Sequence, residues 1–242
     1  MQKAVDLRHA LGPVRNQGPL RGTCVSFALT AAHEHQRIIP SPGQLSIETL
    51  YWGAKQHDGL SGQGTTFQAA DTALQSWGQP LEELWPYDPL RTDVDASYQP
   101  PPAAVESSNC WTAKLIEIAP TFNAIEEALD RGFVVSIGIP TWPGLLRPVG
   151  SQLQNPKSAD LDGELHAVTV VGYRLDTAEI LLRNSWGSMW GDHGHAWIAH
   201  QFLDDHAISA WQLTPLELTV PNVASSSVVE PTAPTANRIG NR

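Results

Sequence analysis

Residues 15–28 read RNQGPLRGTCVSFA, a loop rich in glycine and proline that runs directly into an apolar, alanine-rich segment. Thr23 is a residue type favoured at helix N-caps, so the pattern predicts that Cys24 occupies the first position of a helix. The free N–H groups and positive dipole end of a helix stabilise a thiolate, the nucleophilic form of cysteine. Gln17 lies on the same loop and could direct an amide N–H toward the sulfur. Because most free cysteines are small buried hydrophobes, a catalytic role depends on what lies downstream.

Helical patterns dominate the first half of the chain. Three helices are expected: from Cys24 to about Arg37, from Ile47 to about Lys55 behind a Ser46 cap, and over the period Phe67, Ala70, Leu74, Trp77 before Gly78. Residues 85–109 are rich in proline and polar side chains, which indicates a long irregular connection between two lobes.

Strand patterns dominate the second half. Short apolar runs predict strands at Lys114–Ile118, Phe133–Ile139, His166–Tyr173, Ile180–Asn184 and His195–Ala199. Asn123 and Glu126 have the spacing of a capping box, for a helix that ends at Gly132.

These patterns predict one domain over residues 1–214, with a helical lobe at about 20–110 and a β lobe at about 111–214. Residues 215–242 have no periodic apolar face and are dominated by small and polar residues, which predicts a disordered tail or a linker.

Composition narrows the class of partner and the compartment. The formal net charge is −10, which disfavours nucleic acid and anionic membranes, and no apolar run is long enough to span a bilayer. The two cysteines, Cys24 and Cys110, cannot build a disulfide framework, and the sequence contains no glycosylation sequon. Its first residues lack an apolar stretch of the secretory type, so no signal peptide is expected. We expect a reducing compartment, most simply the cytoplasm of a bacterium, with secretion that needs no signal peptide as the alternative.

A histidine and an asparagine follow Cys24 in motifs of their own. His166 lies 142 residues later in GELHAVTVVGY (163–173), and Asn184 lies a further 18 residues on in RNSWGSMWG (183–191). A nucleophilic thiol needs a base within hydrogen-bond reach, and the base needs a third group that fixes its tautomer. These three residue types, on a helix start and two strands, can supply those roles.

The loop and the two motifs resemble the landmarks of the papain family of cysteine peptidases, and the likeness extends from about Val5 to Ala199. The resemblance implies an α+β, two-lobe fold, in which a helical lobe faces an antiparallel, β-barrel-like lobe across the active-site cleft. It also implies a catalytic triad in which Cys24 is the nucleophile, His166 its acid–base partner and Asn184 the group that orients His166.

The other matching positions imply supporting roles. Gln17 and the backbone N–H of Cys24 would form an oxyanion hole. Trp186 would shield the hydrogen bond of the triad from water, and Gly64 would lend its backbone to an extended substrate.

The chain departs from the family pattern in the loop before Cys24. Arg21 stands where the family usually has a disulfide cysteine, and Val25 stands where it usually has an aromatic residue. Gln17 lies seven residues before Cys24 instead of six. The likeness begins almost at Met1, so no inhibitory propeptide is expected; either the chain is a domain of a longer protein or its activity is controlled in another way.

The reaction implied is hydrolysis of peptide bonds in a peptide or protein substrate through a Cys24 acyl-enzyme, without metal or organic cofactor. Two alternatives stay open: an acyltransferase or peptide ligase that passes the same acyl group to an amine, and a catalytically silent papain-like binding module. Whether an inhibitor protein or a flanking domain also binds the chain is left open by the sequence.

Three further features have plainer interpretations. His193 and His195 fit a turn into a strand better than a metal site, because no cysteines accompany them. Cys110 is expected to be structural. His33 and His35 point in different directions on a helix and are expected at the surface.

Overall fold

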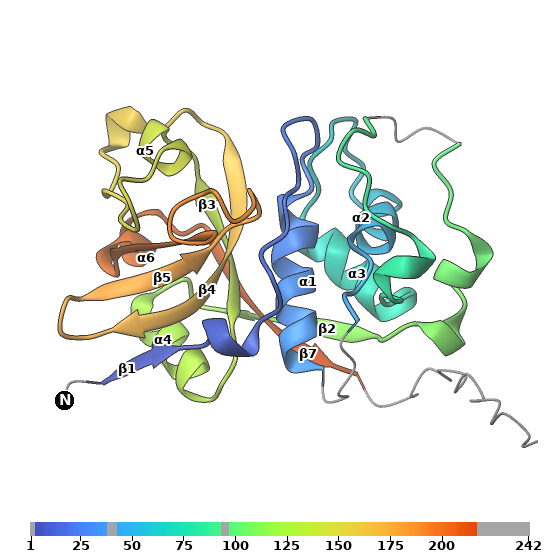
Figure 1. Cartoon of the computed structure of the whole chain (residues 1–242), viewed down its shortest axis with the longest axis horizontal. Helices are drawn as coiled ribbons and strands as arrows, with labels where there is room; N and C mark the ends of the chain where they lie inside the picture. The colour runs from blue at the N-terminus through green and yellow to red at the C-terminus, as the bar shows by residue number, and fades with distance from the viewer. Residues whose placement is uncertain (1–2, 38–42, 93–96, 217–242) are drawn as a thin grey trace, which may run out of the picture.

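The computed structural model describes residues 3–37, 43–92 and 97–216. A helical lobe and a lobe built on an antiparallel sheet lie side by side, with the helix that begins at Cys24 at their junction (Figure 1). The α+β, two-lobe architecture expected from the sequence is confirmed.

The helical lobe is built from α1 (Cys24–Gln36), α2 (Ile47–Lys55) and α3 (Phe67–Ser76). Local capping accounts for the starts of α2 and α3, since the side-chain oxygens of Ser46 and Thr66 accept hydrogen bonds from backbone N–H groups in the first turn. Helix α1 is buried along most of its length because it packs against α2, α3 and the sheet.

The sheet of the described chain has seven strands: β1 (Ala4–Asp6), β2 (Ala113–Ile118), β3 (Val135–Pro140), β4 (Leu165–Arg174), β5 (Glu179–Arg183), β6 (His195–Ala199) and β7 (Ser209–Pro215). Their spatial order is β2-β7-β3-β4-β5-β6, all antiparallel, and β1 also pairs with β4. His166 at the start of β4 and Asn184 just after β5 therefore lie at the adjacent ends of two neighbouring antiparallel strands.

Shorter elements complete the two lobes. They are α4 (Phe122–Asp130), α5 (Pro143–Leu146), α6 (Gln201–His206) and 3-10 helices at Arg8–Ala10, Glu82–Leu84, Pro102–Ala104, Ser107–Asn109 and Ser158–Asp160. The described part of 85–109 is otherwise irregular, as predicted. No helix in the described ranges is both long enough and apolar enough to cross a membrane.

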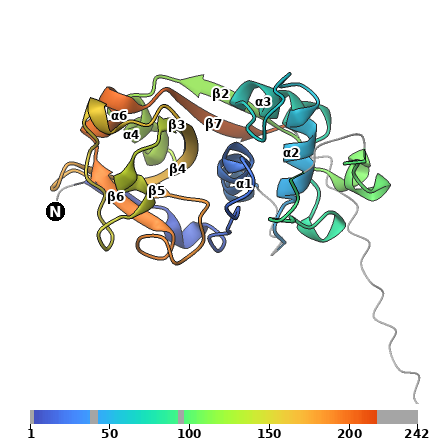
Figure 2. The ribbon, with the colours of Figure 1, turned by 90° about the horizontal axis from the view of Figure 1, so that it is seen from above.

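Three apolar clusters hold the described elements together. One lies between the sheet, α4 and α6, and the second joins α1, α2 and α3 to β2 and β7. The third packs Tyr51 and Trp52 of α2 against Trp85, Tyr98 and Ala104. From above, α1 lies between the sheet and α2, while β2 and β7 run along one side of both lobes (Figure 2). The two lobes are therefore joined by shared strands as well as by α1.

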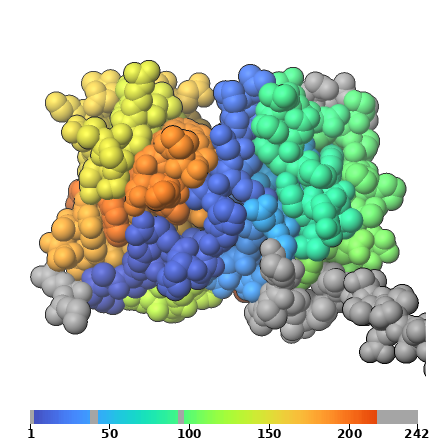
Figure 3. All heavy atoms as spheres, in the orientation of Figure 1, coloured from blue at the N-terminus to red at the C-terminus, as the bar shows by residue number. Residues whose placement is uncertain are grey.

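The N-terminal arm, residues 3–22, ties the lobes together on one face. Drawn in blue, it runs between the orange and yellow β lobe and the green helical lobe (Figure 3). Its Leu7 N–H donates to the Val171 carbonyl at 2.9 Å, and its Gln17 N–H donates to the Ser185 carbonyl at 2.8 Å. The arm thus brings Gln17 beside the segment that carries Asn184.

Thr23 is the N-cap residue of α1 and Cys24 is its first residue, as predicted, although the Thr23 hydroxyl contacts Tyr87 and caps no N–H group. Two other local predictions were wrong. Asn123 lies inside α4, whose N-cap residue is Thr121. His33, expected at the surface, is fully buried, and its Nδ1 atom donates a hydrogen bond to Oε1 of Gln79 at 2.9 Å.

The end of the chain was only partly predicted. Strand β7 was not expected, and it ends at Pro215, one residue beyond the predicted domain of residues 1–214. Residues 217–242, which hold nearly all of the predicted tail, lie outside the described residues.

Candidate active site

Cys24 is the first residue of α1 and is half-buried at the junction of the lobes. Helix α1 packs on β4, where the Thr169 hydroxyl donates to the Ala28 carbonyl at 3.3 Å, and this packing brings the start of α1 to His166. Burial of the sulfur opposes ionisation. The hydrogen bond and charge of His166, aided by backbone N–H groups, outweigh burial and lower the pKa of Cys24 below its usual value.

His166 is buried and held by Asn184. Its Nε2 atom lies 2.8 Å from Oδ1 of Asn184, and the same oxygen accepts the Ser185 N–H at 2.7 Å, which identifies it as the carbonyl oxygen of the amide. Nε2 therefore donates, and Nδ1 is the atom left for Cys24. Burial lowers the pKa of His166, but the hydrogen bond and charge of Cys24 and the bond to Asn184 raise it to above its usual value. The opposed pKa shifts favour a thiolate–imidazolium pair.

Trp186 covers the imidazole of His166. The two rings stack with centroids 4.7 Å apart and planes 29° apart. Trp190 meets Trp186 edge-on at 6.0 Å and is itself fixed, since its Nε1 donates to the Leu145 carbonyl at 2.8 Å. The stacked indole covers one face of the imidazole ring.

Gln17 is buried, and both ends of its amide are fixed. Its Oε1 accepts the Ser185 hydroxyl at 2.6 Å, and its Nε2 donates to the Arg21 carbonyl at 2.9 Å. An amide nitrogen carries two hydrogens, so one N–H remains beyond the bond to Arg21. Ser185 was not singled out from the sequence, although its place next to Asn184 in the motif was a signal that could have indicated it.

Gly64 lies beside the loop that precedes α1. A Cβ placed on Gly22 of that loop would be 3.0 Å from the Gly64 nitrogen, so the two backbones are in close contact. Gly64 itself is exposed, with nothing within 4 Å of where its own Cβ would stand. Lys55 holds this glycine loop, because its ammonium donates to the carbonyls of Leu60, Gly62 and Gly64 at 2.9–3.1 Å.

Two residues that were not assigned to the site from the sequence hold the loop that precedes Cys24. The Tyr87 hydroxyl donates to the Gln17 carbonyl at 2.9 Å and lies 2.8 Å from the Thr23 hydroxyl. Arg21 forms a two-point ion pair with Glu48 in α2, at 2.8 and 2.9 Å. Nothing local in the sequence pairs Arg21 with Glu48.

The other candidates lie away from this arrangement. Cys110 is a buried free thiol whose Sγ is 3.5 Å from the Ala104 carbonyl. His193 and His195 flank the turn into β6, as predicted. Among the residues that the structure describes, no group of three or more His, Cys, Asp or Glu side chains is arranged to hold a metal ion.

Comparison with known proteins identifies several that are similar to this chain in sequence or in fold. The chain is 25% identical over 232 residues to an uncharacterized peptidase C1-like protein of Acanthamoeba polyphaga mimivirus, covering 87% of this chain and 71% of that protein. It is 27% identical over 192 residues to cathepsin K of Mus musculus, covering 77% of this chain and 56% of cathepsin K. Xylellain, a cysteine protease from Xylella fastidiosa, shares the fold with a TM-score of 0.76 at 21% identity, over 90% of this chain and 88% of xylellain.

The chain spans little more than half the length of cathepsin K, so the comparison with that protein concerns one part of it. The family model of papain family cysteine proteases matches residues 1–212, which is most of the chain. The family predicted from the three motifs is therefore confirmed: the chain belongs to the papain family of cysteine proteases.

Proposed function

We propose that the protein is a thiol-dependent peptidase in which Cys24, His166 and Asn184 act as a catalytic triad. One observation carries the proposal: the imidazole that lowers the pKa of Cys24 is the one whose Nε2 is held at 2.8 Å by Asn184. A nucleophile whose base is oriented by a third group is the arrangement that acyl transfer requires.

In the first half of the proposed reaction the Cys24 thiolate attacks the scissile carbonyl carbon, forming a C–S bond and leaving negative charge on the oxygen. The Cys24 N–H and the remaining Nε2 hydrogen of Gln17 stabilise this oxyanion, a contribution of about 3 kcal/mol per donor. His166 then donates its Nδ1 proton to the departing amine as the C–N bond breaks. The acyl group remains on Cys24 as a thioester.

In the second half, neutral His166 takes a proton from water while the water oxygen attacks the thioester. Collapse of the new intermediate releases a carboxylic acid and restores the thiolate and the imidazolium. We assign to Trp186 the exclusion of other water from His166. The exposed backbone of Gly64, beside the loop that carries Cys24, is proposed to pair with an extended substrate chain.

An epoxysuccinyl probe for cysteine peptidases, read by intact and peptide mass spectrometry, tests the proposal. We expect one label on Cys24, no label in Cys24→Ala, and slow labelling in His166→Ala, with Cys110→Ala as the control that labels like the wild type. Cleavage of a peptide library should follow the same pattern.

The outcomes separate the alternatives. Failure of Cys24 to label, or equal labelling of Cys110, would contradict the proposal and favour a binding module. Cys24-dependent products joined to an added amine, without hydrolysis, would favour a ligase.

A further inference from the structure

The loop between Gln17 and Cys24 needs an anchor, because its sequence does little to hold it. It contains Gly18 at φ +73°, and Leu20 is half exposed. No covalent link is present, since both cysteines are free. Noncovalent contacts must therefore set the position of the Gln17 amide, on which the proposed oxyanion hole depends.

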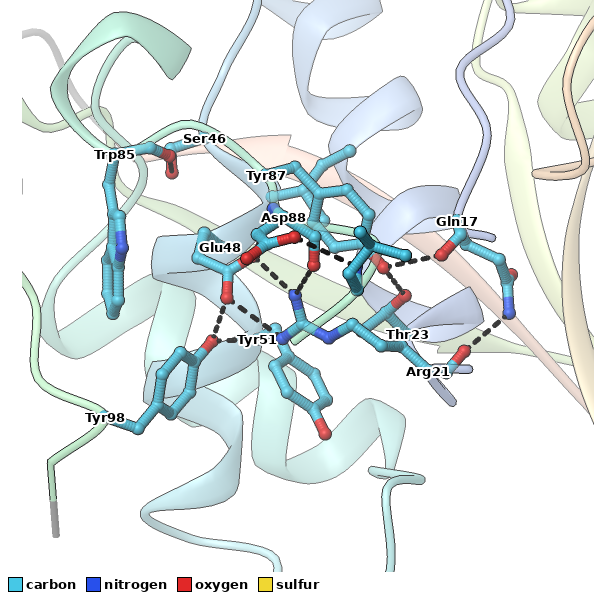
Figure 4. A network of polar contacts seen from close by, with 12 residues as sticks. Gln17, Arg21, Thr23, Ser46, Glu48, Tyr51, Trp85, Tyr87, Asp88 and Tyr98 are labelled. Carbon is cyan, nitrogen blue, oxygen red and sulfur yellow. Dashed lines mark hydrogen bonds and ion pairs between the residues drawn. The ribbon is translucent and has the colours of Figure 1, made fainter. Parts of the chain in front are cut away.

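Arg21 is the buried anchor of this loop, at 3% exposure. Its Nη1 and Nη2 donate to the two carboxylate oxygens of Glu48, which is 1% exposed, and Nη1 also donates to the Asp88 carbonyl at 2.7 Å. The Tyr98 hydroxyl donates to Glu48 at 2.6 Å. Figure 4 shows the guanidinium pointing away from Gln17 toward Glu48 and Tyr98. The loop is thereby attached to α2 through a side chain that solvent does not reach.

The backbone of Arg21 carries this anchor to Gln17. The Arg21 carbonyl accepts Nε2 of Gln17 at 2.9 Å. Tyr87, whose ring centroid lies 4.9 Å from the Arg21 guanidinium carbon, donates its hydroxyl to the Gln17 carbonyl at 2.9 Å. The Arg21 carbonyl therefore fixes the side-chain amide of Gln17 directly. The Arg21 guanidinium also packs on Tyr87, whose hydroxyl holds the backbone carbonyl of Gln17.

We infer that Arg21, held by Glu48, is a positioning residue for the oxyanion hole, which places the amide of Gln17 without touching the substrate. The inference rests on the proposed function. A planar guanidinium paired at two points with a carboxylate fixes one geometry, whereas a lysine ammonium makes a single-point contact. Desolvation offsets much of the attraction within a buried ion pair, so we assign to this pair a defined loop geometry and no large net gain in stability.

Two variants test the inference. Arg21→Lys keeps the charge and loses the two-point contact. Arg21→Met with Glu48→Gln removes both charges together, so that neither is left buried alone, and the glutamine can still accept from Tyr98. The matched control is Arg174→Met with Glu179→Gln, which removes an ion pair of 2.6 Å at the end of β4 remote from His166.

Two rates distinguish positioning from general damage. Hydrolysis of a peptide amide forms an oxyanion, whereas alkylation of Cys24 by iodoacetamide displaces iodide from a saturated carbon and forms none. We expect both Arg21 variants to lower kcat by about 10- to 100-fold, less than the roughly 10²- to 10³-fold loss on removing a donor outright. KM and the alkylation rate should change little, and the control should retain both rates.

A double-mutant cycle shows whether Arg21 acts through Gln17. In a Gln17→Ala background, Arg21→Lys should cost less than about two-fold in kcat, because the residue through which it acts is already gone. Thermal unfolding monitors folding throughout, and Arg21→Lys still offers Glu48 a cation if the paired variant does not fold.

Unchanged kcat in the Arg21 variants would overturn the inference. Equal losses of turnover and alkylation, or full additivity with Gln17→Ala, would also overturn it, since either indicates a general structural role. A wild-type protein whose Cys24 is alkylated but which hydrolyses no peptide would instead overturn the proposed function, and with it the oxyanion hole that Arg21 is inferred to position.

Discussion

The Oδ1 atom of Asn184 accepts two hydrogen bonds at once, from Nε2 of His166 at 2.8 Å and from the N–H of Ser185 at 2.7 Å. The bond to its own chain holds the asparagine carbonyl in place, so the imidazole has a fixed acceptor. Trp186 stacks on the imidazole ring of His166 and so restricts its orientation further. The tautomer and the plane of the proposed catalytic base are therefore set before any substrate binds.

Asn184→Ala should lower kcat/KM for a peptide substrate by about 10- to 100-fold. A hydrogen bond to a charged group contributes about 1.5–3 kcal/mol, and each 1.4 kcal/mol is about ten-fold in rate. Steady-state kinetics measures the effect, and Asn109→Ala, in the 3-10 helix Ser107–Asn109, is the matched control. An unchanged kcat/KM would show that the hydrogen bond does not orient the base.

Cys24 should react with iodoacetamide at a lower pH than an ordinary cysteine thiol does, whose pKa is about 8.5. The pKa of Cys24 is lowered, and a lower pKa means that the reactive thiolate is present at lower pH. In His166→Ala the hydrogen bond and the charge are lost, so the rate profile should move toward alkaline pH. Mass spectrometry of both proteins across the pH range measures the shift, and coincident profiles would count against a thiolate–imidazolium pair.

The Cys110 thiol should be unreactive toward thiol reagents in the native protein. It is 2% exposed, and burial, with the charge of Glu106, raises its pKa to about 11. A chromogenic disulfide reagent should detect one thiol in the folded chain and two after denaturation. Cys110→Ala should retain full turnover at a cost of about 1 kcal/mol in unfolding free energy, the typical size for a point change. Rapid reaction of both thiols under native conditions would contradict this assignment.

Acid should destabilise the fold partly through His33. Burial lowers its pKa to about 4, with the charge of Arg37 acting in the same direction and the hydrogen bond to Gln79 opposing it. In the unfolded chain a histidine titrates near 6.5, so between these pH values the unfolded state binds the extra proton and stability falls as pH falls. The loss attributable to His33 reaches about 3 kcal/mol near pH 4.

Urea unfolding over that pH range measures the effect. The unfolding free energy of His33→Gln should fall less steeply with acid than that of the wild type, because glutamine does not titrate. His193→Gln, at an exposed position, controls for the substitution itself. Parallel curves for His33→Gln and the wild type would remove His33 as a source of acid sensitivity.

The candidate site was largely predictable because its residues carry local signals. Cys24 follows a glycine-rich loop at a helix start, and His166 and Asn184 lie in distinctive strings that predicted two strands, which the structure pairs as β4 and β5. The cap of α2 at Ser46 was equally local. The cap of α4 was not, because Asn123 has a suitable spacing while Thr121, two residues earlier, is the N-cap residue of the helix that begins at Phe122.

The burial of His33 and the presence of strand β7 were not predicted, because both depend on residues that are distant in the sequence. His33 was expected at the surface because histidine is polar, yet Gln79, 46 residues away, supplies the hydrogen bond that permits burial. Strand β7 has weak local strand character, and its pairing with β2, about a hundred residues earlier, decides its conformation.

By itself, the sequence indicated the papain family, the α+β class, and Cys24, His166 and Asn184 as the candidate triad. The family and the triad were implied by the resemblance of three local motifs to those of the family, and the class also by local helix and strand patterns. Only the tertiary structure decided that Arg21 pairs with Glu48, that His33 is buried and that β7 joins the sheet. The chain holds 25 acidic residues, and nothing near Arg21 in the sequence selects Glu48 among them. That choice is made where the loop and α2 are packed together, because only there are two opposite charges removed from water at hydrogen-bond distance.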